Sequence, residues 1–255
     1  MATGSLALLL HQLPLRFRGL ETIGKIVFLI DLTTFIFISA AMVARFAFTR
    51  RLLRKSLYDD REAFFFGAFW VSIALLIQNV ASYGVPECGK WLVKVVEVVF
   101  WTYWTIVLVS SVGQYHALFV HRNLSIEKMT PMWLLPIYPL LVTGPLAGVV
   151  VGVVERERAQ AVWVVGVASQ GLGWMVAVFM YALWALRLLT EELPVRGRRA
   201  GMFIAVGPTG VFLFLYTTPC TFLYRDVILF AAKSTRLTRF SRLYPHGSAL
   251  PRRIR

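Results

Sequence analysis

Residues 129–154 read MTPMWLLPIYPLLVTGPLAGVVVGVV, a run that contains no Asp, Glu, Lys or Arg. At about 1.5 Å per residue, a helix of this length would cross the roughly 30 Å of hydrocarbon in a lipid bilayer. Five further segments are long and almost as poor in charge, namely 26–44, 63–85, 98–120, 159–186 and 200–224. Open sheets would leave backbone groups unpaired in lipid. The sequence therefore predicts an all-α polytopic membrane protein with six full transmembrane helices.

The composition agrees with this class and excludes several others. The 255 residues are 58% hydrophobic and 16% charged, whereas soluble domains carry roughly 25% charged residues. The two cysteines and four histidines show no metal-binding spacing, and no nucleophile or phosphate-loop motif is present. We therefore expect no enzyme, no cofactor or metal site and no nucleic-acid partner.

The two ends of the sequence differ from the six long segments. Residues 1–15 are uncharged but too short to span a bilayer, so they predict an N-terminal half helix. Residues 225–255 carry eight basic residues and one acidic residue, which predicts a disordered basic tail after a transmembrane domain at 1–224. Before the tail, twelve basic residues lie on the side of the 45–62 loop and seven on the other side. This asymmetry predicts that the 45–62 loop is cytoplasmic.

Four blocks of sequence resemble a known family in their order and spacing. They are LPLRFRGLETIGKIV at 13–27, PMWLLPIYP at 131–139, QGLG at 170–173 and GMFIAVGP at 201–208. Together they look like the fungal malic acid transport proteins, which belong to the tellurite-resistance and C4-dicarboxylate transporter family and are related to plant slow anion channels.

The resemblance implies a fold of ten transmembrane helices in which the odd-numbered helices form an inner ring around a pore. Residues 1–13 would be the second half of the first helix, and the six full segments would be helices two to seven. The chain would then be a shortened member of the family. The implied function is transport of malate or a similar C4-dicarboxylate, with small organic or inorganic anions and the lipid bilayer as partners and the plasma membrane as the location.

Proline and glycine within the fourth and sixth segments indicate where a substrate path would run. Proline inside a helix removes a backbone hydrogen bond and bends the axis, and freed carbonyls in a membrane protein often line a wet cavity. A bent helix that only packs against its neighbours is the alternative for 133–143. Glu62, at the start of the second segment, either belongs to the path or caps a helix. The predicted substrate pathway consists of Glu62, Trp133, Pro136, Pro139, Thr143, Phe203, Gly207 and Pro208.

Other residues in these segments have simpler interpretations. Asp31 either takes part in transport or lies shallow enough to reach the membrane interface. Gly144, Gly148 and Gly152 form a small-xxx-small pattern that predicts close helix packing. Helix-flanking arginines, Arg198 and Arg199, either attract an anion or mark the cytoplasmic side.

Two alternatives remain beside malate transport. One is an efflux or channel protein for sulfite or another anion, because fold does not determine cargo. The other is a truncated remnant without transport activity, because the implied inner ring is incomplete. A homo-oligomer could complete the ring.

Overall fold

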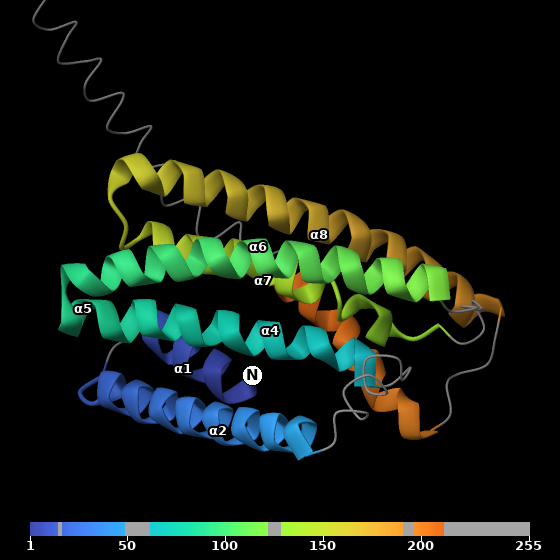
Figure 1. The fold of residues 1–255 in the computed structure, drawn as a ribbon, viewed down its shortest axis with the longest axis horizontal. Helices are drawn as coiled ribbons and strands as arrows, with labels where there is room; N and C mark the ends of the chain where they lie inside the picture. The colour runs from blue at the N-terminus through green and yellow to red at the C-terminus, as the bar shows by residue number, and fades with distance from the viewer. Residues whose placement is uncertain (15–16, 49–61, 122–128, 191–195, 212–255) are drawn as a thin grey trace, which may run out of the picture. The chain divides into compact units, whose positions relative to one another are not determined.

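The computed structural model describes residues 1–14, 17–48, 62–121, 129–190 and 196–211 (Figure 1). Contacts divide the chain into Met1–Leu215 and Tyr216–Arg255, and all described residues lie in the first unit. The predicted tail at 225–255 therefore lies outside the described residues. The described elements, in chain order, are α1 (Ala2–Gln12), α2 (Leu20–Phe48), α4 (Glu62–Asn79), η1 (Val80–Gly84), α5 (Val85–Cys88), α6 (Lys90–His121), η3 (Pro131–Leu134), α7 (Tyr138–Val151), α8 (Arg156–Thr190) and η4 (Arg196–Ala205).

The described part of the chain is all helical, which confirms the predicted fold class. Four helices are long and apolar enough to cross a membrane, and they match four of the predicted segments. They are Leu20–Phe48, Phe66–Cys88, Lys90–Ala117 and Arg156–Thr190. The predicted half helix is α1, whose 11 residues extend about 16 Å.

The other two predicted spans are interrupted. The segment 129–154 divides into η3 and α7, and the described part of 200–224 is a shorter apolar helix, Gly201–Val211. Both contain proline within the apolar run, and proline cannot donate the backbone hydrogen bond that a continuous helix needs.

Short connections bring consecutive helices side by side. Gly89 separates α5 from α6 and has a φ of 78°, a conformation that favours glycine. The chain reverses at this residue, so α6 runs back along the helix formed by α4, η1 and α5 (Figure 1). α1 packs against both α2 and α4.

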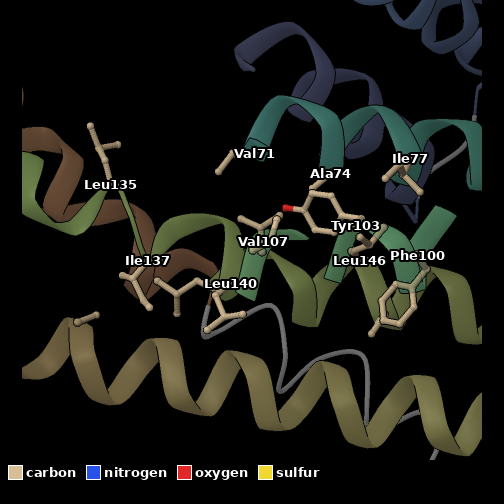
Figure 2. Packing of buried hydrophobic residues seen from close by; sticks show 14 of the residues in the cluster. Val71, Ala74, Ile77, Phe100, Tyr103, Val107, Leu135, Ile137, Leu140 and Leu146 are labelled. Carbon is tan, nitrogen blue, oxygen red and sulfur yellow. The ribbon is translucent and has the colours of Figure 1, made fainter. Parts of the chain in front are cut away.

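The core lies around α7. This helix packs against α4, α6 and α8, and ten of its 14 residues are buried. Figure 2 shows side chains from three of these helices meeting, with Ala74 from α4, Phe100 and Tyr103 from α6 and Leu146 from α7. By contrast, only 6% of the apolar window of α2 is buried. We infer that α2 is peripheral and faces lipid, whereas α7 is central.

Candidate functional site

The helix is interrupted between Leu134 and Tyr138, where the sequence predicted a bent but continuous helix. The amides of Leu135 and Ile137 donate to the carbonyls three residues earlier, at 3.0 and 3.1 Å, so the backbone tightens before α7 begins. Pro139 does not bend a helix interior as expected. It lies in the first turn of α7, where a missing N–H leaves no gap in the hydrogen bonding. The proline inside α7 is Pro145, which the sequence analysis did not single out.

The carbonyls at this break accept hydrogen bonds from hydroxyl groups on α6. Their donors are three side chains of α6, of which Ser111 and Tyr115 are one turn apart and Tyr103 lies about two turns before Ser111. The bonds are Tyr115 Oη to Trp133 O at 2.9 Å, Ser111 Oγ to Pro136 O at 2.8 Å and Tyr103 Oη to Pro139 O at 3.3 Å. We call Tyr103, Ser111 and Tyr115 the hydroxyl row. For these three carbonyls, the row favours the packing interpretation over the wet cavity.

Three faces of α7 can be distinguished from its contacts. One contains Pro139 and Thr143, and Thr143 is 0% exposed with its hydroxyl donating to Pro139 O at 3.0 Å. A second face packs on α8, because a methyl group at Gly144 would overlap the Gln170 amide. The third contains Tyr138 and Val149, which are half-buried and lie within about 20° of each other on the helix. Pro145 lies about 20° from Tyr138 on this side and is buried, so the third side is also packed.

The glycines of α7 and α8 allow close packing, as predicted for part of the small-xxx-small pattern. Gly144 meets α8, whereas Gly152 ends α7. On α8, a methyl at Gly166 would overlap the Ala147 side chain, and one at Gly173 would crowd Leu141. These contacts bring the two backbones near each other.

The segment 196–211 is held to α7 and α8 through its own carbonyls. Tyr138 Oη donates to Ile204 O, Tyr181 Oη donates to Ala205 O and Gln170 Nε2 donates to Val211 O at 2.9 Å. The 3₁₀ helix η4 ends at Ala205, and helical residues 206–211 follow.

Gly207 and Pro208, the predicted pair at this second interruption, each have a local structural role. A side chain at Gly207 would overlap the ring of Tyr138, so only glycine allows this approach without displacement. Pro208 lies in the first turn of the helical residues 206–211, where its missing N–H is tolerated.

The predicted pathway residues fall into two groups that the structure brings together. The first group is buried in η3, in α7 and between them, and consists of Trp133, Pro136, Pro139 and Thr143. The second group consists of Phe203 in η4 and of Gly207 and Pro208 directly after it. The two groups are close because η3 packs against η4. Phe203 is 79% exposed, and Pro208 is buried. Glu62 begins α4, but its side chain lies outside the described part of the chain, as do those of Arg198 and Arg199.

Polar side chains of α2, α4 and η1 hold α1 in place. Asn79 Nδ2 donates to Gly4 O at 3.0 Å, and Tyr83 Oη donates to Ala7 O at 2.7 Å. Asp31 is 6% exposed and accepts a hydrogen bond from Thr3. The expectation that Asp31 reaches the interface is therefore wrong, because its carboxylate faces α1.

Charged side chains in the described residues pair with each other at one end of the bundle. Lys25 Nζ lies 2.8 Å from Glu87 Oε1, and Arg158 Nη1 lies 3.1 Å from Glu97 Oε2. These pairs join α2 to α5 and α8 to α6. Within the described ranges, no group of three His, Cys, Asp or Glu side chains could hold a metal ion.

The sequence analysis missed the hydroxyl row and the tyrosines that hold η4. The row had only a weak signal, because the same segment also contains Thr102, Thr105, Ser110 and Gln114. Tyr138 and Tyr181 had none, because their acceptors are backbone atoms of a distant segment.

Comparisons with known proteins agree with this architecture. The family model described as voltage-dependent anion channel (SLAC1) matches residues 1–233. The chain is 32% identical over 208 residues to the "Malic acid transport protein" of Schizosaccharomyces pombe, a match that covers 82% of this chain and 48% of the relative. A "Putative malic acid transport protein" of the same organism is 29% identical with the same coverage.

A more distant relative is named for a different cargo. The "Sulfite efflux pump SSU1" of Arthroderma otae is 25% identical over 211 residues, which cover 82% of this chain and 56% of the relative. The chain thus spans about half the length of the curated relatives it matches. No solved structure matches the chain.

Proposed function

Because the chain belongs to the voltage-dependent anion channel family, we propose that it carries small anions across a membrane, with malate or a similar C4-dicarboxylate as the cargo. The chain is a multi-pass integral membrane protein, with four long apolar helices among its described residues, and a plasma membrane location fits the family. The names of the relatives describe transport and not chemical conversion, which supports a function other than catalysis.

One observation carries the choice of an anion. At both interrupted segments, side chains donate hydrogen bonds to backbone carbonyl oxygens. The hydroxyl row does so at η3 and α7. At 196–211 the donors are Tyr138, Tyr181 and Gln170. Carbonyl oxygens that face a path attract cations, as in potassium filters. Turning these oxygens toward neighbouring helices removes partial negative charge from the path, which suits an anion.

The proposed path runs along α7 and the segment 196–211. In this arrangement Pro136, Pro139, Gly207 and Pro208 shape the two interruptions, while Trp133 and Phe203 supply aromatic lining. Thr143 and Glu62 complete the proposed set. Thr143 would act through its buried hydrogen bond to Pro139 O, and Glu62 would act at the start of α4.

Sulfite is the second candidate cargo, because the chain is also similar to sulfite efflux pumps. The uptake experiment below therefore includes sulfite. The identity to the malate relatives is higher, at 32% against 25%, which favours malate.

Uptake of labelled malate into liposomes that contain the 255-residue chain tests the proposal. We expect saturable malate uptake above the level of protein-free liposomes, and stronger inhibition by unlabelled malate than by sulfite. Stronger inhibition by sulfite would reverse the order of the two cargoes. Uptake equal to that of protein-free liposomes would contradict transport by this chain.

A further inference from the structure

Gln78 has a buried amide without a partner. Its side chain is 1% exposed, and neither Nε2 nor Oε1 has a hydrogen-bond partner within the described residues. The neighbouring Asn79 lacks a partner only at Oδ1, because its Nδ2 donates to the carbonyls of Gly4 and Leu75. Water is scarce in a bilayer interior, so an unpaired amide there lowers stability. Such a group calls for a partner that comes and goes, such as water or a ligand.

The position of Gln78 on α4 brings it to the side of α7. Gly67 lies eleven residues earlier, which is about three helical turns, so the two residues share a face to within roughly 20°. A methyl at Gly67 would overlap the Leu135 carbonyl at the start of the break before α7. Gln78 therefore lies on the face of α4 that packs against α7.

Gln78 lies near the middle of its helix and close to an irregular turn of the backbone. It follows Glu62 by 16 residues and precedes Cys88 by ten in one continuous helix, which places it near the middle of the hydrocarbon layer. Two residues later the helix changes to the π-helical turn η1, and such turns are frequent at functional sites.

We propose that the Gln78 amide binds the transported anion and selects for an oxyanion that carries an O–H group. This inference rests on the proposed function. Nε2 donates a hydrogen bond to an oxygen of the anion, and Oε1 accepts one from its O–H. A hydroxy acid, a singly protonated dicarboxylate and hydrogensulfite satisfy both amide atoms, whereas chloride satisfies the donor alone.

Gln78→Met tests the proposal, because methionine has a similar length and shape but cannot form these hydrogen bonds. In liposomes that contain the full chain, we expect the half-saturating malate concentration to rise about tenfold or more, the effect of losing a hydrogen bond to a charged group. Inhibition of malate uptake by chloride should weaken less than malate binding does, because chloride loses only the donor. Gln160→Met, at an exposed position of α8, is the control and should leave malate uptake unchanged.

Two arms identify the source of the O–H group. At about pH 7, where carboxyl groups are ionised, malate differs from succinate by its hydroxyl, so a preference for malate that Gln78→Met abolishes identifies that hydroxyl. At about pH 4, succinate carries a carboxyl proton, so succinate uptake that rises in the original protein and not in Gln78→Met identifies the acid proton. If Gln78→Met keeps both the preference for malate at about pH 7 and the rise in succinate uptake at about pH 4, the proposal is overturned.

Thermal unfolding in detergent separates binding from a structural role. We expect Gln78→Met to melt at the same temperature or higher, because it removes an unpaired polar group, and a clearly lower temperature would overturn the proposal. If the original protein shows no uptake, the proposed function fails, and the rise in melting temperature on adding malate then tests Gln78 by itself. A rise that is equal in the original protein and in Gln78→Met, or absent from both, overturns the binding role.

Discussion

The hydroxyl row predicts a ranked loss of stability when its three donors are removed one at a time. Ser111 is 3% exposed, and Ser111→Ala leaves the buried Pro136 carbonyl without the 2.8 Å bond. Tyr115→Phe likewise removes the 2.9 Å bond to Trp133 O and keeps the ring. Side-chain hydrogen bonds in membrane proteins contribute about 0.6 kcal/mol on average and up to about 1.7 kcal/mol. We expect each of these two substitutions to cost an amount within that range.

Tyr103→Phe should cost less than the other two substitutions, below about 0.5 kcal/mol. Its bond to Pro139 O is longer, at 3.3 Å, and the same carbonyl also accepts the Thr143 hydroxyl at 3.0 Å. The carbonyl therefore keeps a partner after the substitution, so no buried acceptor is left unpaired.

Unfolding in mixed detergent micelles, followed by tryptophan fluorescence, gives the free energies for this series. Thr105→Val on the same helix is the control, because Thr105 is exposed and its hydroxyl donates to Trp101 O of its own helix. We expect no measurable change for this variant. Equal losses for Tyr103→Phe and Ser111→Ala would refute the role assigned to Thr143, and losses no larger than that of the control would refute the row itself.

Two further predictions compare matched glycines. Gly166→Ala should destabilise the protein by about 1–3 kcal/mol in the same unfolding assay, because its methyl would overlap a side chain of α7, whereas Gly171→Ala, which has open space, should be neutral or slightly stabilising. Gly207→Ala should shift η4 away from Tyr138 and lower malate uptake, while Gly210→Ala, with no atom nearby, should leave uptake unchanged. Equal effects within either pair would argue against the packing described at that glycine.

Much of the architecture could be predicted from the sequence because long apolar segments have one stable form in a bilayer. The matches at 26–44, 63–85, 98–120 and 159–186 follow from length and charge alone. An irregularity near Pro136 was predictable for a different reason, because proline lacks a backbone donor wherever it occurs.

The direction of the freed carbonyls could not be predicted, because it depends on the neighbouring helix. Pro136 fixes where the backbone is interrupted, but the position of Ser111 on α6 determines what its carbonyl meets. Asp31 is a second example. Its depth along the sequence indicated the interface, whereas the packing of α1 buries it beside Thr3. Both outcomes depend on contacts between segments, which local patterns do not contain.

Helices α6 and α8, which we call the outer helices, therefore have a role in the proposed path although they do not line it. An interrupted helix is tolerated in a membrane only when other groups satisfy its backbone. α6 meets this need with Ser111 and Tyr115, while residues elsewhere on the same helix, such as Val98 and Val109, are exposed and suited to lipid. α8 does the same for the segment 196–211 through Gln170 and Tyr181. If this division holds, substitutions in the outer helices that remove a donor will alter transport through the backbone geometry of α7 and 196–211, without any contact with the anion.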